Sequence, residues 1–190
     1  MSKSLVVASG PSGRQWAKLW LQLGCPDIYA VNGVLADAEM RRLCTYAVCT
    51  ESECVEPWED QPLDKGHWIV SSHKAKYYTE ACTAYDESDY WLQSGVSVGG
   101  STIAALDHAL ARYDEVHSIG IDLCYKGETR YWHSDYMDSA GVVEWLGVRT
   151  RWEWCWRAVK LHDWRQGKPW IDHSAGLLDI LARPKLPDGL

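Results

Sequence analysis

Phenylalanine is absent from this chain of 190 residues, which holds twelve tryptophans and ten tyrosines instead. Tryptophan and tyrosine carry a polar N–H or O–H group, so they suit pocket walls and half-buried faces, although most of them fill ordinary core positions. Basic residues are outnumbered, because 19 Lys and Arg stand against 26 Asp and Glu and give a formal net charge of −7. Phosphate backbones need basic patches, so this balance argues against a nucleic-acid surface.

Long apolar runs are also missing. No segment approaches the roughly 20 apolar residues that a membrane-spanning helix needs, so we expect no membrane span. The first four residues lead directly into a short apolar run, and we expect no signal peptide. Close CxxC pairs are absent among the seven cysteines. Cys44, Cys49 and Cys54 are spaced by five, which does not suit zinc, so we expect no metal site, reduced thiols and a cytoplasmic location.

The apolar and charged fractions, 46% and 24%, are those of a globular protein. The length fits one domain over 1–190, and the polar, aromatic and irregular stretch at 72–93 suits a lid or surface excursion. Apolar runs predict strands at 5–8, 28–31, 46–49, 67–71, 116–121 and 169–171. Helical spacing predicts helices at 16–23, 36–43, 101–113, 140–146 and 175–182. The segment 150–164 fits a strand or a helix, and its length favours a helix.

Two stretches lead from an apolar or glycine-rich run into a helix. Leu5 to Ala8 run into Ser9, Gly10, Pro11 and Ser12, and Ser94 and Gly95 precede the helix at 101–113, which Ser101 or Thr102 can cap. A strand, a glycine turn and a helix start bring unpaired amide groups and a partial positive charge together, which suits a phosphate. The pattern predicts an α/β fold, a mostly parallel sheet with helices on both faces, and a nucleotide-type pocket at its carboxyl edge.

Taken in order, these motifs resemble a known family. An apolar strand enters Gly10, Pro11 and Ser12, a second strand ends at Asn32, Ser94 and Gly95 precede a long helix, and a strand ending at Asp122 leads into a tyrosine-rich loop. This order resembles the Rossmann-like bacterial sialyltransferases that use CMP-sialic acid. It is also similar to a related group, common in archaea and phages, that includes 6-hydroxymethylpterin pyrophosphokinases.

The resemblance implies a role for each matching residue. Gly10, Pro11, Ser12 and Asn32 would hold the cytidine nucleotide, and Ser94 and Gly95 would also face it. Ser9, in the same turn, and Asp122, at the end of its predicted strand, are further candidate nucleotide-binding residues. Tyr125 and Tyr131 would assist departure of the nucleotide phosphate, and His133 would be the general base. The family has Asn where this chain has Ser9, and the chain is shorter than those enzymes, so the acceptor-binding lid would be reduced.

Chemistry supports these assignments and leaves alternatives. Histidine has the pKa range of a base, tyrosine hydroxyls can stabilise a leaving phosphate, and Asn32 suits ribose hydroxyls. Equally, the Gly10 turn can be a simple helix start, Asn32 a turn residue, Asp122 a brace for the next loop, and His133 a surface histidine. His173 and Ser174, just after the last predicted strand, could line the same pocket.

We therefore expect a nucleotide-sugar-dependent glycosyltransferase that binds a CMP-type nucleotide or nucleotide-sugar and requires no metal. One alternative is a pyrophosphokinase-like enzyme using ATP and Mg²⁺, for which Asp122, Glu128 and Asp135 are the nearby acidic residues. Another is a non-catalytic protein that sequesters a nucleotide signal.

Overall fold

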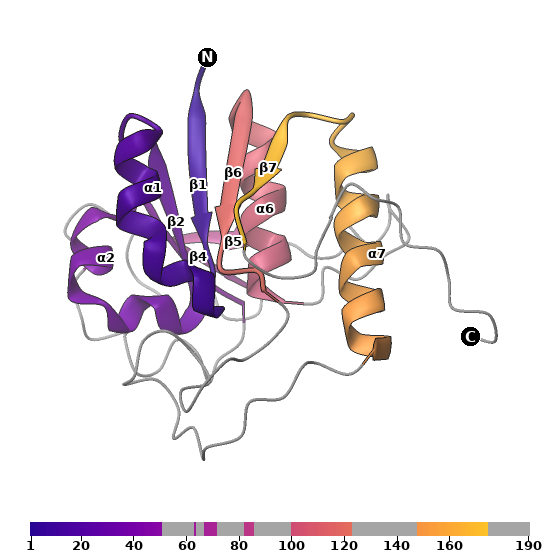
Figure 1. Ribbon diagram of the computed structural model, residues 1–190, viewed down its shortest axis with the longest axis horizontal. Helices are drawn as coiled ribbons and strands as arrows, with labels where there is room; N and C mark the ends of the chain where they lie inside the picture. The colour runs from indigo at the N-terminus through magenta and orange to yellow at the C-terminus, as the bar shows by residue number, and fades with distance from the viewer. Residues whose placement is uncertain (51–62, 64–66, 72–81, 86–99, 123–147, 175–190) are drawn as a thin grey trace.

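The fold is a parallel β-sheet with helices against it (Figure 1), as seen in a computed structural model that describes residues 1–50, 63, 67–71, 82–85, 100–122 and 148–174. The strands are β1 (Lys3–Val7), β2 (Asp27–Val31), β3 (Tyr46–Cys49), β4 (His67–Ser71), β5 (Cys82–Tyr85), β6 (Glu115–Ile119) and β7 (Trp170–Asp172). The helices are η1 (Pro11–Gln15), α1 (Trp16–Gln22), η2 (Asn32–Ala36), α2 (Ala38–Leu43), α6 (Ser101–Arg112) and α7 (Val148–Trp164), where η marks a 3-10 helix.

The seven strands form one sheet in the order β5-β4-β3-β2-β1-β6-β7, and every neighbouring pair is parallel. The chain builds outward from β1 to β5 on one side, then crosses over and continues with β6 and β7 on the other. Within this sheet the five neighbouring strands β3-β2-β1-β6-β7 have the order of a Rossmann-like fold, so the predicted α/β class is confirmed. The order reverses between β1 and β6, and ligands of such sheets bind near that point, at the carboxyl ends of the strands.

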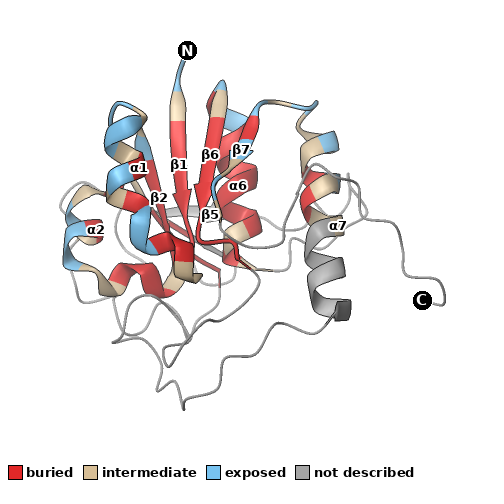
Figure 2. Cartoon of the chain, viewed as in Figure 1, coloured by how far each residue is buried: buried red, intermediate tan, exposed pale blue. Residues whose placement is uncertain are grey.

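Apolar side chains of the central strands point to both faces of the sheet, as expected for strands buried on two sides. Val6, Tyr29 and Val116 belong to one core cluster with α6 and α7, and Leu5 and Ile28 belong to a second cluster with α1, η2 and α2. The central strands are therefore red along most of their length in Figure 2. In Figure 1, α6 lies behind β6, whereas no described helix lies in front of β6 and β7.

Helix α7 confirms the helical interpretation of 150–164. Arg165, the residue after α7, links this helix to α6. Its guanidinium donates to the Asp107 carboxylate with an Nε–Oδ1 distance of 2.6 Å. Helix α2 begins at the N-cap Asp37, whose side chain accepts from the amides of Glu39 and Met40. The predicted helices at 140–146 and 175–182 lie outside the described residues.

Two expectations about local structure were wrong. The stretch 72–93 contains β5, which pairs in parallel with β4 at the edge of the sheet, so these four residues are not an irregular excursion. The strand is only four residues long and is interrupted by the polar Thr83, so it lacks the apolar run by which strands are predicted. Helix α6 is capped by neither Ser101 nor Thr102, since its N-cap is Gly100, which makes no side-chain capping bond.

Candidate functional site at the carboxyl edge

The glycine turn after β1 is locked to the segment that follows β6. The amide of Gly10 donates to the carbonyl oxygen of Gly120 at 2.8 Å, and the amide of Gly120 donates to Ser12 Oγ at 3.0 Å. The amide of Ser12 donates to Asp122 Oδ2 at 2.7 Å. These contacts join two segments more than a hundred residues apart in sequence at the point where the strand order reverses.

The close approach depends on two glycines. A Cβ atom on Gly10 would meet Gly120 O at 2.4 Å and Asp122 Oδ2 at 2.5 Å. Gly120 has a φ of +84°, and a Cβ there would meet Ala8 O at 2.1 Å. Real Cβ atoms do not come this close to backbone, so both positions require glycine for packing, and Gly120 requires it for its backbone conformation as well.

The amides of this turn are already in use. Gly10 and Ser12 donate to the β6 segment, and the amide of Gly13 donates to Gly10 O at 2.9 Å. The expectation that the turn presents unpaired amides to a phosphate is therefore wrong for these three groups. The reason is that the carboxylate of Asp122 occupies the position at the start of η1 where an external anion would bind.

Asp122 itself is incompletely paired. Its side chain is 2% exposed, and while Oδ2 accepts from Ser12, Oδ1 is buried and has no hydrogen-bond partner among the described residues. A buried, unpaired acceptor carries a desolvation penalty of about 1–3 kcal/mol, and more when it is charged. Buried polar atoms in folded proteins nearly always have a hydrogen-bond partner, so Oδ1 of Asp122 is an exception among the described residues.

Asn32, at the end of the neighbouring strand β2, shows the same deficiency. Its Oδ1 atom is buried and without a partner in the described part of the chain. Its backbone is left-handed, with a φ of +52°, which is unfavourable for most residues with a side chain and tolerated best by asparagine. A strained residue with an unpaired buried oxygen is a combination that is common where a residue is kept for function.

Strand β7 adds a second carboxylate to this edge. Asp172 Oδ1 accepts from Ser118 Oγ at 2.7 Å and from Ser174 Oγ at 2.8 Å. Ser174 Oγ in turn accepts from the amide of Ile121, at 2.8 Å, which places it next to Asp122. Burial raises the pKa of Asp172, and the negative charge of Asp122 raises it further, whereas the two serine hydroxyls lower it. Asp172 was not predicted as a site residue, although an acidic residue at the end of a predicted strand was the signal used for Asp122.

The N-terminus of α6 reaches the same edge of the sheet beside β3. Ser101 Oγ accepts from the Thr50 amide at 2.9 Å and lies 3.0 Å from Thr50 Oγ1, so its hydroxyl ties the helix to the residue after β3 instead of capping it. Gly100, at the N-cap, has a φ of +124°. A helix start without a side-chain cap keeps the positive end of its dipole available to an anion.

The structure thus brings some of the predicted residues together. Ser9, Gly10, Pro11 and Ser12 form the turn after β1, Asn32 follows β2 and Asp122 follows β6. Ser94, Gly95, Tyr125, Tyr131 and His133 lie outside the described residues. Within the described ranges no group of three or more His, Cys, Asp or Glu side chains is arranged to hold a metal ion.

Comparisons of the chain with models of known families, with curated proteins and with solved structures found no match. In the described part of the chain, no helix combines the length and the apolar character needed to cross a membrane.

Proposed function

We propose that the protein binds a nucleotide at the carboxyl edge of the sheet, where β1, β2 and β6 end. The observation that carries this proposal is the pair of buried, unpartnered acceptor oxygens, Oδ1 of Asp122 and Oδ1 of Asn32. Asn32 follows β2 and Asp122 follows β6, and these two strands lie on either side of β1 in the sheet. Two such oxygens call for a ligand that brings hydrogen-bond donors.

The donors define which part of the nucleotide binds here. An ionised phosphate has no donor at neutral pH, and the carboxylate of Asp122 repels it. The hydroxyl groups of a ribose are donors, and a carboxylate or amide oxygen is a suitable partner for them. We therefore assign the ribose to Asp122 and Asn32. The phosphate would lie nearer the N-terminus of α6, where the helix dipole favours negative charge.

The reaction that we propose is transfer of a sugar from a CMP-type nucleotide-sugar, as the resemblance to sialyltransferases implies. His133 would take the proton of the acceptor hydroxyl, and Tyr125 and Tyr131 would stabilise the departing phosphate. Asp122 and Asn32 would hold the ribose in place while the bond to the sugar breaks. Such a donor needs no bound metal. The free thiols of Cys25, Cys44 and Cys49 fit the reducing cytoplasm, which we propose as its location.

A thermal-shift panel tests the proposal. CMP and CMP-sugars at millimolar concentration are expected to raise the melting temperature, and inorganic pyrophosphate alone is not. Asp122→Asn is expected to lose most of the CMP-induced shift. Asp114→Asn is the matched control. That exposed carboxylate lies just before the start of β6, at the opposite edge of the sheet, and bonds only to Ser2 among the described residues. The proposal fails if no nucleotide changes the melting temperature. Stabilisation by ATP only with Mg²⁺ would replace it with the pyrophosphokinase alternative.

A further inference from the structure

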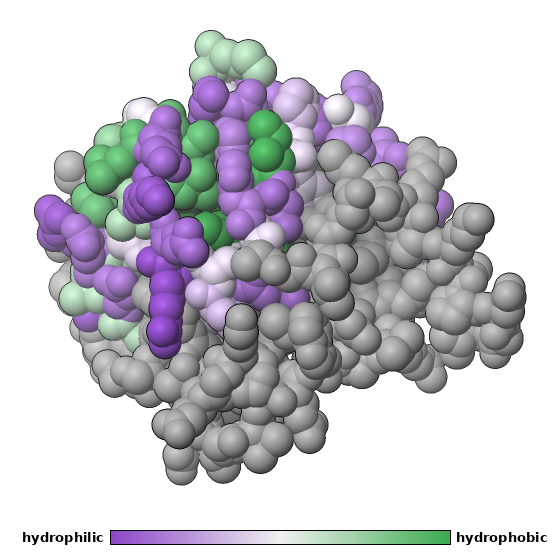
Figure 3. All heavy atoms as spheres, viewed as in Figure 1, coloured by the Kyte–Doolittle hydropathy of each residue, from purple (hydrophilic) through white to green (hydrophobic). Residues whose placement is uncertain are grey.

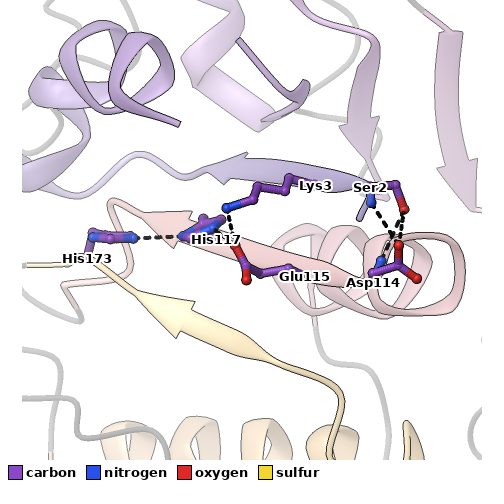
Figure 4. A network of polar contacts seen from close by, with 6 residues as sticks. All are labelled: Ser2, Lys3, Asp114, Glu115, His117 and His173. Carbon is purple, nitrogen blue, oxygen red and sulfur yellow. Dashed lines mark hydrogen bonds and ion pairs between the residues drawn. The ribbon is translucent and has the colours of Figure 1, made fainter. Parts of the chain in front are cut away.

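A chain of three titratable side chains runs over β6 and β7, on the side where no described helix lies in front of these two strands (Figure 1 and Figure 4). Glu115 Oε1 lies 2.7 Å from His117 Nε2, and His117 Nδ1 lies 2.9 Å from His173 Nε2. The two imidazole rings are stacked with an interplanar angle of 26°. Lys3 Nζ lies 2.6 Å from the same Glu115 oxygen. Figure 3, from the viewpoint of Figure 1, shows hydrophilic residues along the middle of this face between two hydrophobic areas.

The Glu115 carboxylate is the charged end of this chain. The ammonium of Lys3 and the hydrogen bond from His117 hold the pKa of Glu115 below its usual value, so Glu115 is ionised. Lys3 already neutralises that charge. His117 is 3% exposed, and while its Nε2 faces the Glu115 carboxylate, its second nitrogen meets the imidazole of His173.

With both imidazole rings neutral, the hydrogen bonds have only one consistent direction. An ionised carboxylate can only accept, so the proton of neutral His117 is on Nε2 and its Nδ1 is an acceptor. His173 must therefore donate from Nε2, which leaves the lone pair of its Nδ1 free to take a proton. Burial against its neighbours and the proximity of His117 lower the pKa of His173, which keeps it neutral near pH 7.

The three side chains Glu115, His117 and His173 are called the relay below. The position of His173 connects the relay with the carboxyl edge of the sheet. Its amide donates to Ser118 O at 2.8 Å, and the next residue, Ser174, accepts from the amide of Ile121. In Figure 4 the three side chains progress in the direction in which β1 points, with His173 last and its second nitrogen turned away from His117. The His173 side chain is exposed to solvent.

We propose that Glu115 and His117 are positioning residues that make Nδ1 of His173 a general base for the carboxyl-edge site. This inference rests on the proposed function and assigns the proton of the acceptor hydroxyl to His173 in place of His133. The O–H bond of the acceptor hydroxyl breaks as the proton moves to His173 Nδ1. The acceptor oxygen bonds to the sugar carbon, and the nucleotide phosphate leaves with the electron pair. Because Nε2 keeps its own proton, His173 becomes an imidazolium bonded to His117 Nδ1.

Nitrogen NMR of ¹⁵N-histidine-labelled protein tests the relay directly, since it reports which ring nitrogen carries the proton. The relay predicts the Nε2–H form for both His117 and His173 at pH 7.5. In Glu115→Gln we expect the pKa of His173 to fall by a few tenths, because a nearby negative charge is lost. Glu39→Gln is the control, as that carboxylate is exposed and belongs to α2. An Nδ1–H form of His173, or a pKa of His173 that is the same in Glu115→Gln as in the wild type, overturns the inference.

Adding CMP to the same sample separates the inference from the proposed function. We expect CMP to raise the melting temperature and to shift the Nδ1 resonance of His173, while the resonances of His162, in α7, stay unchanged. If CMP raises the melting temperature but does not shift the His173 resonance, nucleotide binding is supported and the proposed role of His173 is wrong. The absence of any CMP effect removes both.

Discussion

The backbone amide of Ser12 donates to the carboxylate of Asp122 at 2.7 Å, across 110 positions of sequence. The bond joins the turn after β1 to the end of β6, the two strands between which the sheet reverses its order. One oxygen of Asp122 thus organises the protein's own backbone, while the other is left without a partner in the described part of the chain. Because the two oxygens differ in this way, we assign the first to the fold and the second to a ligand.

The bond itself can be tested by comparing two substitutions of Asp122. Asp122→Ala leaves the buried Ser12 amide without an acceptor, whereas Asp122→Asn keeps an acceptor oxygen of the same size. We expect the alanine variant to be less stable than the asparagine variant by about 1–3 kcal/mol in urea unfolding. Equal stability of the two would show that the Ser12 amide does not depend on this carboxylate.

Three glycines with different surroundings test the packing of the turn. Gly24→Ala introduces a Cβ at a φ of +82° with no atom within 4 Å, so only backbone strain of about 1 kcal/mol is expected. Gly120→Ala adds a steric conflict with the Ala8 backbone to the same strain, and Gly10→Ala conflicts with the Gly120 backbone. Both are expected to lower the melting temperature well beyond Gly24→Ala. Comparable melting temperatures for all three would contradict the close approach of the two segments.

Asn32 is expected to show opposite effects on stability and on binding. Asn32→Gly removes an unpaired buried oxygen and relieves a φ of +52°, so the variant should equal or exceed the wild type in stability by up to about 1 kcal/mol. It should also bind CMP more weakly. Asn32→Ala keeps the strained φ and is expected to be less stable than Asn32→Gly. A glycine variant that loses stability, or one that binds CMP as the wild type does, contradicts the assignment of Asn32 to a ligand.

His108 predicts how stability depends on pH. The side chain is 6% exposed, its Nδ1 lies 2.9 Å from the Tyr29 hydroxyl, and burial, followed by the charge of Arg112, lowers its pKa from 6.5 to about 4. The folded state therefore disfavours the proton that the unfolded chain binds below pH 6.5. Stability is full above that pH and declines as the pH falls toward 4, by an amount on the order of 3 kcal/mol.

Urea unfolding between pH 7.5 and 4 measures this effect. Substitution His108→Gln retains an acceptor for Tyr29 and removes the titrating group, so the slope between pH 6.5 and 4 should become clearly smaller. An unchanged slope in the variant would assign the acid sensitivity to other groups.

Strong local patterns made most of the fold predictable from sequence. Apolar runs such as that of Val6 and Val7 predicted the central strands, and the apolar stripe of Ile103, Leu106 and Leu110 predicted α6. Strand β5 was not predicted, because four residues at the edge of a sheet are too few to show a hydrophobic periodicity. The strands β2 and β6, which precede Asn32 and Asp122, were also visible in the sequence.

The internal use of the turn's amides could not be predicted. It depends on the carboxylate of Asp122 reaching the Ser12 amide, a contact between distant segments that no local pattern encodes. The same holds for the relay of Glu115, His117 and His173. Glu115 and His117 share a face of β6 by their spacing, but only the pairing of β6 with β7 brings His173 to them.

The most direct test of the central claim is calorimetric titration with CMP and with its 2′,3′-dideoxy counterpart. If the buried oxygens of Asp122 and Asn32 accept hydrogen bonds from the ribose, CMP binds and the dideoxy compound binds at least about tenfold more weakly. In Asp122→Asn and Asn32→Gly that difference should shrink. Equal affinities of the two nucleotides for the wild-type protein, or no binding of CMP, would contradict the assignment of these oxygens to a ribose.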